Sequence, residues 1–228
     1  MFTLDQVVPW GRSFDEYRAM FSLTDADLDG RILGCGDGPA SFNATASRLG
    51  KRVVACDPIY HFSAADIRRR VEETCEQVLA QTRQNQHEFV WTSIPSVEEL
   101  GRVRMQAMDA FLADYPAGVT EGRYIAAELP TLPFADGEFD LALCSHFLFL
   151  YSAQLGDAFH RDAVRELARV AREVRVFPLL ALGGAPSPFV EGCVATLREA
   201  GVDAIVERVD YEFQRGGNHM LRCRRRAD

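Results

Sequence analysis

The sequence predicts an α/β fold in which helices cover both faces of a mostly parallel sheet. Short apolar runs alternate with helical segments along much of the chain, and this alternation is typical of parallel strands joined by crossover helices. The run Phe139–Ser145 is apolar on both faces, as expected for a central strand of such a sheet. Two strand-like segments near the C-terminus, with Gly216-Gly217-Asn218 between them, predict a closing antiparallel hairpin.

The first half of the sheet is expected to hold three strands. Helix Ala40–Leu49 joins the first two of them, because Pro39 suits the start of a helix and Gly50 its end. The strands are placed at Arg31–Cys35, Arg52–Asp57 and Tyr124–Ala127.

The second half follows the same pattern. After the strand Phe139–Ser145, apolar residues at helical spacing predict a helix at Asp157–Ala171. A fifth strand lies within Glu173–Leu182, and helix Pro188–Ala200 ends at Gly201. The two strands of the hairpin are expected at Val202–Phe213 and His219–Arg224.

More than sixty residues separate the second and third strands, far more than is usual for a connection in such a fold. We interpret the chain as one domain, residues 1–228, that contains a helical insertion at residues 61–122. Helices are expected at Ser63–Gln84 and Ser96–Tyr115, and Ser96 with Glu99 forms the pattern of a capping box. The insertion is either a lid or cap that faces the substrate or a packing helix pair with no role in chemistry.

The charge of the chain argues against nucleic-acid partners. Its net charge is −8, whereas a general nucleic-acid surface needs net or clustered positive charge. No window approaches the roughly 18 apolar residues of a membrane span, so no membrane partner is expected. One basic cluster, interpreted as a solvated chain end, consists of Arg222, Arg224, Arg225 and Arg226.

The cysteines indicate a reducing compartment and no metal site. The six cysteines include no Cys-x-x-Cys pair, so a zinc site is not expected. The N-terminal residues carry early acids and no long apolar core, unlike a signal peptide. We therefore expect a cytoplasmic protein. Four of the cysteines lie in strand-like apolar runs, where a free cysteine acts as a small buried hydrophobic residue: Cys35, Cys56, Cys144 and Cys223.

A glycine loop, Gly34-Cys35-Gly36-Asp37-Gly38, follows the first strand. Glycines between a strand and a helix let the backbone approach a ligand closely. The dinucleotide fingerprint G-x-G-x-x-G fails here, because Pro39 replaces its last glycine in one register and Ser41 in the other. This weakens the case for an NAD-linked oxidoreductase without excluding it.

Polar residues also end the later strands, where parallel sheets bind their ligands. Asp57 ends the second strand, and an acid there accepts hydrogen bonds from both hydroxyls of a ribose; the alternative is a plain strand-end or capping acid. Glu128 follows the third strand with a carboxylate suited to an adenine amino group, although by itself it is an unremarkable surface acid. Ser145 and His146 close the fourth strand.

Together these features resemble the class I (Rossmann-like) S-adenosylmethionine-dependent methyltransferases. The resemblance covers Ile32 to Tyr151 by motif and the rest of the chain by strand pattern. Its most specific part is Leu132-Pro133-Phe134 with Phe139-Asp140, similar to the family's LPF-x-DGxFD stretch. The resemblance implies a Rossmann-like three-layer αβα sandwich with a mostly parallel seven-stranded sheet and an antiparallel last strand.

The resemblance also implies S-adenosyl-L-methionine as the cofactor. Gly36 and Gly38 match the first two loop glycines of the family, and Ala40 matches the third. Gly34 stands where the family has an acid that helps hold the methionine amino end, so Asp37 or the N-terminal segment has to take that role. The expected cofactor-binding residues are Gly34, Cys35, Gly36, Asp37, Gly38, Asp57, Pro58, Glu128, Leu129, Ser145 and Arg12.

Arg12 lies in an aromatic-rich segment, Pro9–Tyr17, ahead of the first strand. In similar enzymes such a segment folds over the cofactor, and we expect Arg12 to bind the methionine carboxylate. The alternative is a solvated arginine on a helix that packs its aromatic residues on the sheet. If the acceptor has to lose a proton, His146 is the best-placed catalytic base and Tyr151 is a weaker one.

The leading hypothesis is a methyltransferase that acts on a small-molecule acceptor, as a monomer or homodimer. The second is a non-catalytic domain that has kept the fold and binds S-adenosylmethionine, S-adenosylhomocysteine or a partner, which the missing acid at Gly34 favours. The third is an NAD-linked oxidoreductase. The acceptor stays open, because acceptor pockets are built from insertions and loops.

Overall fold

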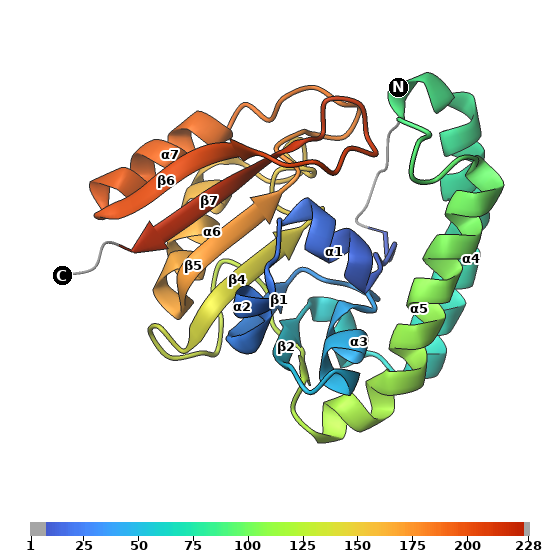
Figure 1. The fold of residues 1–228 in the computed structure, drawn as a ribbon, viewed down its shortest axis with the longest axis horizontal. Helices are drawn as coiled ribbons and strands as arrows, with labels where there is room; N and C mark the ends of the chain where they lie inside the picture. The colour runs from blue at the N-terminus through green and yellow to red at the C-terminus, as the bar shows by residue number, and fades with distance from the viewer. Residues whose placement is uncertain (1–7, 226–228) are drawn as a thin grey trace.

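One seven-stranded sheet runs through residues 8–225, the part of the chain that the computed structural model describes (Figure 1). Its strands are β1 (Arg31–Cys35), β2 (Arg52–Cys56), β3 (Tyr124–Ile125), β4 (Phe139–Ser145), β5 (Ala171–Phe177), β6 (Val202–Arg208) and β7 (His219–Arg225). Their order in the sheet is β3-β2-β1-β4-β5-β7-β6, and β7 runs antiparallel to β5 and β6, whereas the other pairs of neighbours are parallel. The predicted mostly parallel sheet with an antiparallel last strand is confirmed.

Helices cover both faces of this sheet, which confirms the three-layer αβα sandwich. The helices α1, α3 and α5 pack on one face, and α6 and α7 pack on the other. The described helices are α1 (Phe14–Met20), α2 (Asp25–Asp29), α3 (Phe42–Arg48), α4 (Ala64–Gln84), α5 (Val97–Thr120), α6 (Asp157–Val170) and α7 (Val190–Glu199), with short 3₁₀ turns at Pro58–His61 and Gln86–Glu88.

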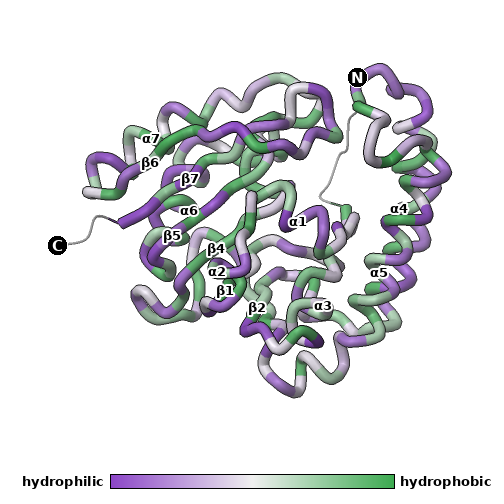
Figure 2. The backbone as a smooth tube through the Cα atoms, in the orientation of Figure 1, coloured by the Kyte–Doolittle hydropathy of each residue, from purple (hydrophilic) through white to green (hydrophobic). Residues whose placement is uncertain are grey.

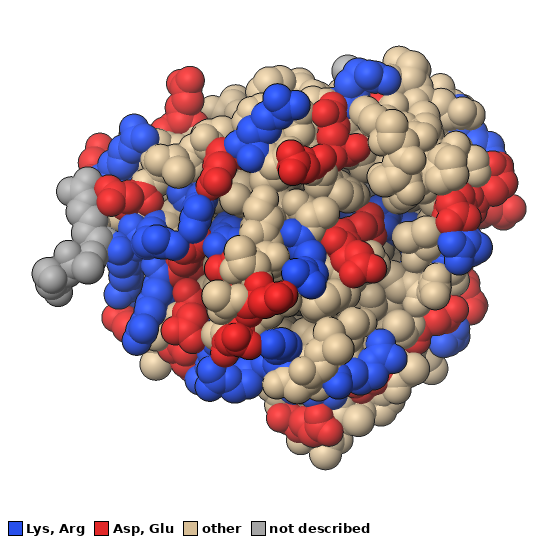
Figure 3. Space-filling model, viewed as in Figure 1, with Lys and Arg blue, Asp and Glu red and all other residues tan. Residues whose placement is uncertain are grey.

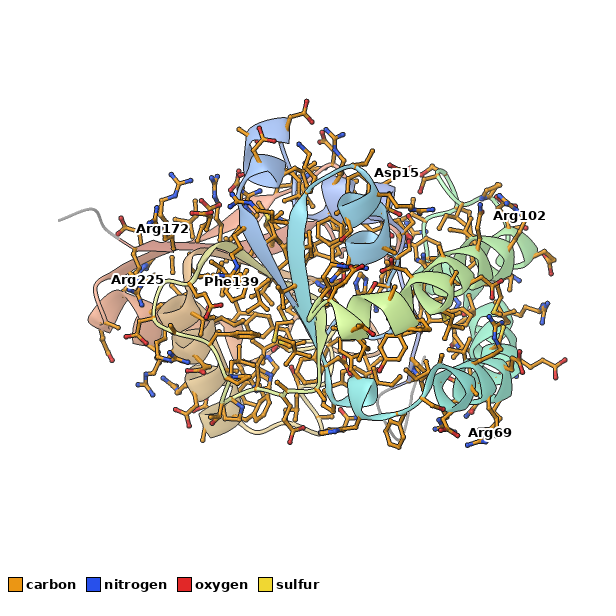
Figure 4. The ribbon with its side chains drawn as sticks, turned by 90° about the horizontal axis from the view of Figure 1, so that it is seen from below. Asp15, Arg69, Arg102, Phe139, Arg172 and Arg225 are labelled. Atoms are coloured by element: carbon orange, nitrogen blue, oxygen red, sulfur yellow. The ribbon has the colours of Figure 1, made fainter. Side chains whose placement is uncertain are left out.

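The alternation of side chains along the strands builds two cores. Ile32 of β1 and Leu141 of β4 face α1 and α3, whereas Leu33 of β1 and Ala142 of β4 face α6 and α7. Figure 2 shows polar and apolar residues alternating along α4. In Figure 4, Phe139 lies among packed side chains in the middle of the molecule. Each such buried side chain contributes about 1.5–3 kcal/mol of transfer free energy.

Several element boundaries differ from those that the sequence predicts. The strand β3 pairs over two residues only, at the edge of the sheet. The strand β5 ends at Phe177, because Pro178 has no backbone N–H to continue the ladder. The helix α5 runs past Tyr115 and through Pro116 to Thr120. Its last turn packs directly on β3, where a Cβ on Gly118 would lie 2.3 Å from the Tyr124 ring.

The predicted insertion contains α4 and α5, which lie side by side as a long helical hairpin (Figure 1). The second half of α5 is part of the sheet packing, because Met108 and Phe111 form a buried cluster with Ala55 of β2 and Tyr124 of β3. The helix α4 packs on this layer through Ile67. The outer faces of both helices carry charged side chains, such as Arg69 and Arg102 in Figure 4. The lid or cap role of residues 61–122 stays a prediction.

Charges of both signs are interspersed on the face seen in Figure 3. The basic C-terminal run belongs to β7, where Arg222 and the exposed Arg224 pair with Glu173 of β5, and the exposed Arg225 donates to the Ala168 carbonyl. Arg226 lies outside the described residues. Within residues 8–225 we find no helix that is both long and apolar enough to cross a membrane.

Candidate functional site

A cavity of about 560 Å³ lies at the carboxyl ends of β1, β2 and β4. The strand order reverses between β1 and β4, and open α/β sheets bind their ligands at this kind of switch point. The volume is within the usual range for small-molecule sites. Of the predicted site residues, all except Gly34 line this cavity: Arg12, Cys35, Gly36, Asp37, Gly38, Asp57, Pro58, Glu128, Leu129, Ser145, His146 and Tyr151.

The glycine loop places its backbone at the wall of the cavity. Gly36 and Gly38 have φ angles of +68° and +53°, a conformation that side chains other than glycine rarely adopt. The N–H of Gly36 donates to the Cys56 carbonyl at 2.9 Å, so the loop is fixed against the end of β2. A Cβ on Gly36 would lie 2.9 Å from the Phe147 ring. The two glycines are therefore required for this path of the chain.

Asp37 occupies the space that a side chain at residue 34 would take. A Cβ built on Gly34 would lie 1.8 Å from Asp37 Oδ2, so the buried carboxylate of the loop folds back over the last residues of β1, at Gly34. The Tyr17 hydroxyl donates to Asp37 Oδ1 at 2.8 Å. Burial, opposed by this hydrogen bond and reinforced by Asp57, raises the pKa of Asp37 to about 7. Gly34 itself does not line the cavity, and its contribution is to make room for this acid.

Asp57 connects the end of β2 to the glycine loop. Its Oδ2 accepts the Gly38 N–H at 2.8 Å and its Oδ1 accepts the Ile59 N–H at 2.9 Å. Burial raises the pKa of Asp57, with Glu128 adding to the effect, although both hydrogen bonds lower it. A carboxylate has about four acceptor positions, so two remain for a ligand. Asp57 thus combines the capping role and the ligand-facing position that the sequence left as alternatives.

The adenine side of the predicted site follows β3. Glu128 is exposed at the rim of the cavity and Leu129 beside it is buried. Glu128 and Thr131 form an isolated bridge that turns the chain here. Pro58, at the start of a 3₁₀ turn, lines the same part of the cavity. This part therefore offers an apolar wall beside the carboxylate of Glu128.

His146 follows β4 with a φ of +51°, an unusual backbone conformation for a residue with a side chain. Its N–H donates to the Phe177 carbonyl at 2.7 Å, and its Nδ1 lies 3.0 Å from Ser145 Oγ. Burial and the nearby Arg12 and Arg104 keep the pKa of His146 well below its usual range. The imidazole is consequently neutral at pH 7, and the same burial and positive charges disfavour its protonation.

The second candidate base, Tyr151, is buried and lines the cavity from the segment after His146. Its hydroxyl accepts the Val8 N–H at 3.4 Å. Burial raises the pKa of Tyr151, so the phenol is protonated at neutral pH. It is better suited to donating a hydrogen bond than to removing a proton.

The N-terminal segment closes over the glycine loop and brings Arg12 to the cavity. The Ser41 N–H donates to the Arg12 carbonyl at 3.0 Å, and a Cβ on Gly11 would lie 2.1 Å from the Pro39 carbonyl oxygen. The Arg12 guanidinium donates to the Trp10 carbonyl at 2.6 Å, but its buried Nε has no partner. Burial and Arg104 lower the pKa of Arg12 to about 10, so it stays charged at neutral pH.

A buried ion pair lies beside Arg12. Arg104 of α5, only 1% exposed, donates to Glu16 of α1, and the Tyr211 hydroxyl donates to the same carboxylate at 2.9 Å. Although burial opposes it, the ion pair lowers the pKa of Glu16 to about 2. These contacts tie the insertion to the N-terminal helix and to the segment before β7.

The far half of the cavity is apolar. It is closed on one side by the loop after α4, where the Val90 N–H donates to the Phe213 carbonyl at 2.7 Å and the Phe89 and Phe213 rings lie 5.2 Å apart. Within residues 8–225 no three histidine, cysteine or acidic side chains are grouped to hold a metal ion. The apolar lining of this half includes Phe62, Val78, Phe89, Leu100, Leu155, Phe159, Leu182 and Phe213.

A comparison with known proteins covers nearly the whole chain. No family model matches it. The chain is 33% identical over 227 residues to the uncharacterized protein MJ0045 of Methanocaldococcus jannaschii, and the match spans 97% of this chain and 98% of that protein. The chain belongs to the MJ0045 family.

Solved structures show what fold this member of the MJ0045 family has. It matches the N-methyltransferase NodS of Bradyrhizobium japonicum WM9, in complex with S-adenosyl-L-homocysteine, at 12% identity and a TM-score of 0.50, over 94% of this chain and 88% of NodS. The magnesium protoporphyrin IX methyltransferase of Synechocystis PCC 6803 with bound SAM matches at 11% identity and a TM-score of 0.49, over 93% and 78%. The match to NodS shows the class I methyltransferase fold, which confirms the resemblance inferred from the sequence.

Two polar residues of this MJ0045-family site were missed by the sequence analysis. Tyr17 was noted only as an aromatic residue, and its hydrogen bond to Asp37 depends on how α1 packs on the loop. Arg104 lies in a helix rich in charged residues, where an arginine is usually solvated. Its position in an otherwise apolar stripe, with Leu100 and Met108 one turn away on either side, was the available signal.

Proposed function

We propose that the protein is an S-adenosylmethionine-dependent methyltransferase that acts on a small-molecule acceptor. The observation that carries the proposal is the position of Asp37, whose carboxylate fills the space of a side chain at residue 34. An acid is thereby present where the sequence alone lacks one. This supports a catalytic domain over a non-catalytic one.

The residues around the cavity match the parts of this cofactor. We assign Asp57 to the ribose hydroxyls, Glu128 to the adenine amino group and Asp37 to the methionine amino group. Arg12 is assigned to the methionine carboxylate, because its buried Nε lacks a partner and a buried donor without a partner is costly. When bound, the cofactor supplies an electrophilic methyl group.

The chain itself contributes positioning and proton transfer. Holding an acceptor in line with a methyl group supplies much of the rate of such a reaction. We propose that His146 removes a proton from an acceptor hydroxyl or amine, because its neutral ring lies at the switch point and lines the cavity. The hairpin of α4 and α5 is proposed to form the wall on the acceptor side.

Calorimetry with S-adenosylmethionine, S-adenosylhomocysteine and NAD tests this function. We expect both sulfur compounds to bind at micromolar concentrations and NAD not to bind. Absence of binding of either sulfur compound at millimolar concentration would refute the proposal. Binding without methyl transfer to any molecule of a broad acceptor panel would instead support a non-catalytic cofactor-binding domain.

Replacing His146 by alanine is expected to leave the affinity for S-adenosylhomocysteine within threefold and to lower methyl transfer by about a hundredfold, the usual contribution of a general base. Transfer is measured as radiolabel passing from methyl-labelled S-adenosylmethionine into a small-molecule cell extract. Tyr151→Phe is the matched control and should lose less than tenfold. Unchanged transfer in the His146 variant would exclude this residue as the base.

A further inference from the structure

The proposed cofactor contacts leave two charged residues of the cavity without a role, Arg70 and Arg104, and only Arg104 is buried. Arg104 is buried in the middle of α5 and lines the cavity. Its Nη1 donates to Glu16 Oε2, but its Nε is buried and has no hydrogen-bond partner. A buried donor without a partner costs about 1–3 kcal/mol, so its retention in a helix that otherwise packs well needs a reason.

The hydrogen bonds of Glu16 are already used within the protein. Besides Arg104, its carboxylate accepts the Ser13 N–H at 2.9 Å and the Tyr211 hydroxyl at 2.9 Å. One carboxylate therefore faces two guanidinium groups, those of Arg12 and Arg104. Neither Asp37, which is bonded to Tyr17, nor the neutral His146 offsets the second positive charge.

Binding of the cofactor changes the balance of charges around Arg12 and Arg104. The methionine carboxylate that we assign to Arg12 balances one charge, whereas the sulfonium adds a positive charge of its own. The carboxylates of Asp37, Asp57 and Glu128 are all assigned to the cofactor, so the attraction for an anionic group is local to Arg104. Arg104 is the buried cation on the insertion side, and opposite charges attract strongly where water is excluded.

The rest of that side of the cavity is suited to an apolar molecule. The helices α4 and α5 contribute Val78 and Leu100, the closing loops contribute Phe89 and Phe213, and Leu155 and Phe159 lie on the side of α6. Burying such surface on a ligand contributes about 25 cal/mol per Å². The lining favours a hydrophobic body joined to a single anionic group.

We propose that the methyl acceptor is a hydrophobic carboxylic acid, and that Arg104 binds its carboxylate on the insertion side of the cavity. The inference rests on the proposed methyltransferase function. The carboxylate acts as an anchor, and a separate hydroxyl or amine of the same molecule faces His146. Arg104 is a specificity residue in this arrangement and takes no part in the transfer itself.

The test compares matched acids and amides as ligands. The protein is saturated with sinefungin, a cofactor analogue that carries an amine where the methyl group is transferred, and calorimetry measures 2-naphthoate against 2-naphthamide and decanoate against decanamide. We expect at least one acid to bind tenfold or more tightly than its amide. If every acid binds no more tightly than its amide, or none binds at millimolar concentration, the proposal is wrong.

Substitutions at Arg104 test whether this residue binds the carboxylate of the acid. Because Arg104→Met alone leaves Glu16 unpaired, we pair it with Glu16→Gln, and we expect the double variant to reduce the acid-to-amide ratio to within threefold while amide affinity stays unchanged. Arg104→Lys keeps the charge but loses the Nε donor and should retain part of the preference. Arg70→Met, which removes an exposed cation at the same cavity, should leave the ratio unchanged.

Two results separate this inference from the proposed function. Failure of S-adenosylhomocysteine to bind any form of the protein contradicts the methyltransferase proposal, whatever the acids do. Normal cofactor binding with an acid preference that persists in the double variant contradicts the role of Arg104 alone. Melting curves of each variant confirm that it is folded before its affinities are compared.

Discussion

Replacing Asp57 by alanine is expected to weaken the binding of S-adenosylhomocysteine by a hundredfold or more. The carboxylate is assigned to both ribose hydroxyls, and hydrogen bonds to a charged group contribute about 1.5–3 kcal/mol each. The substitution also releases the N–H groups of Gly38 and Ile59, which Asp57 holds at 2.8 and 2.9 Å. The loss of affinity should therefore exceed that of a residue that only contacts the ligand.

Two further variants test whether the loss of affinity is specific to the carboxylate of Asp57. Asp57→Asn keeps one carbonyl oxygen and should have an intermediate effect. Asp109→Ala removes an exposed carboxylate that pairs with Arg68 on the outer side of the hairpin and should leave affinity unchanged. An Asp57→Ala protein that binds the cofactor within threefold of the unmodified chain would show that the motif has been aligned in the wrong register.

Asp37→Asn is expected to weaken cofactor binding and to stabilise the fold, two opposite effects of one change. The asparagine retains the shape of the side chain and can still bond to Tyr17, but it offers no charge to the methionine amino group. We expect at least tenfold weaker binding of S-adenosylhomocysteine at pH 8. Gly34→Ala should weaken binding as well, because its methyl group requires the space of Asp37 Oδ2.

The stability effect follows from the pKa of Asp37, which burial raises from 3.8 to about 7. Between these two values the folded chain binds a proton that the unfolded chain has released, so the stabilising contribution is complete below pH 4 and is lost as the pH rises through 7. Each difference of one in pKa corresponds to about 1.4 kcal/mol. The free energy of unfolding of the Asp37→Asn variant should therefore exceed that of the unmodified chain by on the order of 2 kcal/mol or more at pH 8, and the two should be equal at pH 4.

Urea denaturation at both pH values measures this gain. Calorimetry over the same range should show that cofactor affinity of the unmodified chain rises as Asp37 ionises near pH 7, whereas the variant lacks this rise. Equal free energies of unfolding for the two proteins at pH 8 would contradict the raised pKa. A variant that is more stable but binds the cofactor normally would instead remove Asp37 from the cofactor site.

The sequence was most informative where an element is buried on both sides. The strands β1 and β4 have the predicted boundaries, because central parallel strands need continuous apolar runs that end at the cavity. The edge strand β3 is shorter than predicted, since little packing extends it. The helix predicted to end at Tyr115 continues to Thr120, and its last turn packs on β3 through Gly118 and Tyr124.

The cavity residues that follow β1, β2, β3 and β4 were predictable, because each follows a strand whose position was known. The remaining wall was not, because it is formed by the contact of α5 with α1 and of the loop after α4 with the segment before β7. Contacts between segments so far apart leave no local pattern. Arg104 and Tyr211 therefore appeared as ordinary charged and aromatic residues until the fold brought them together.

The shared space of Gly34 and Asp37 has a consequence for the divergence of the MJ0045 family. Residue 34 cannot acquire a side chain while an acid at residue 37 folds back over it, and an acid at 37 has no such place to lie once residue 34 carries one. The two positions are thus expected to covary. Relatives should carry either glycine at residue 34 with an acid at residue 37, or an acid at residue 34 with a different residue at residue 37. Chains that carry an acid at both positions should be rare among functional relatives, and an evolutionary path between the two states has to pass through a weakened intermediate.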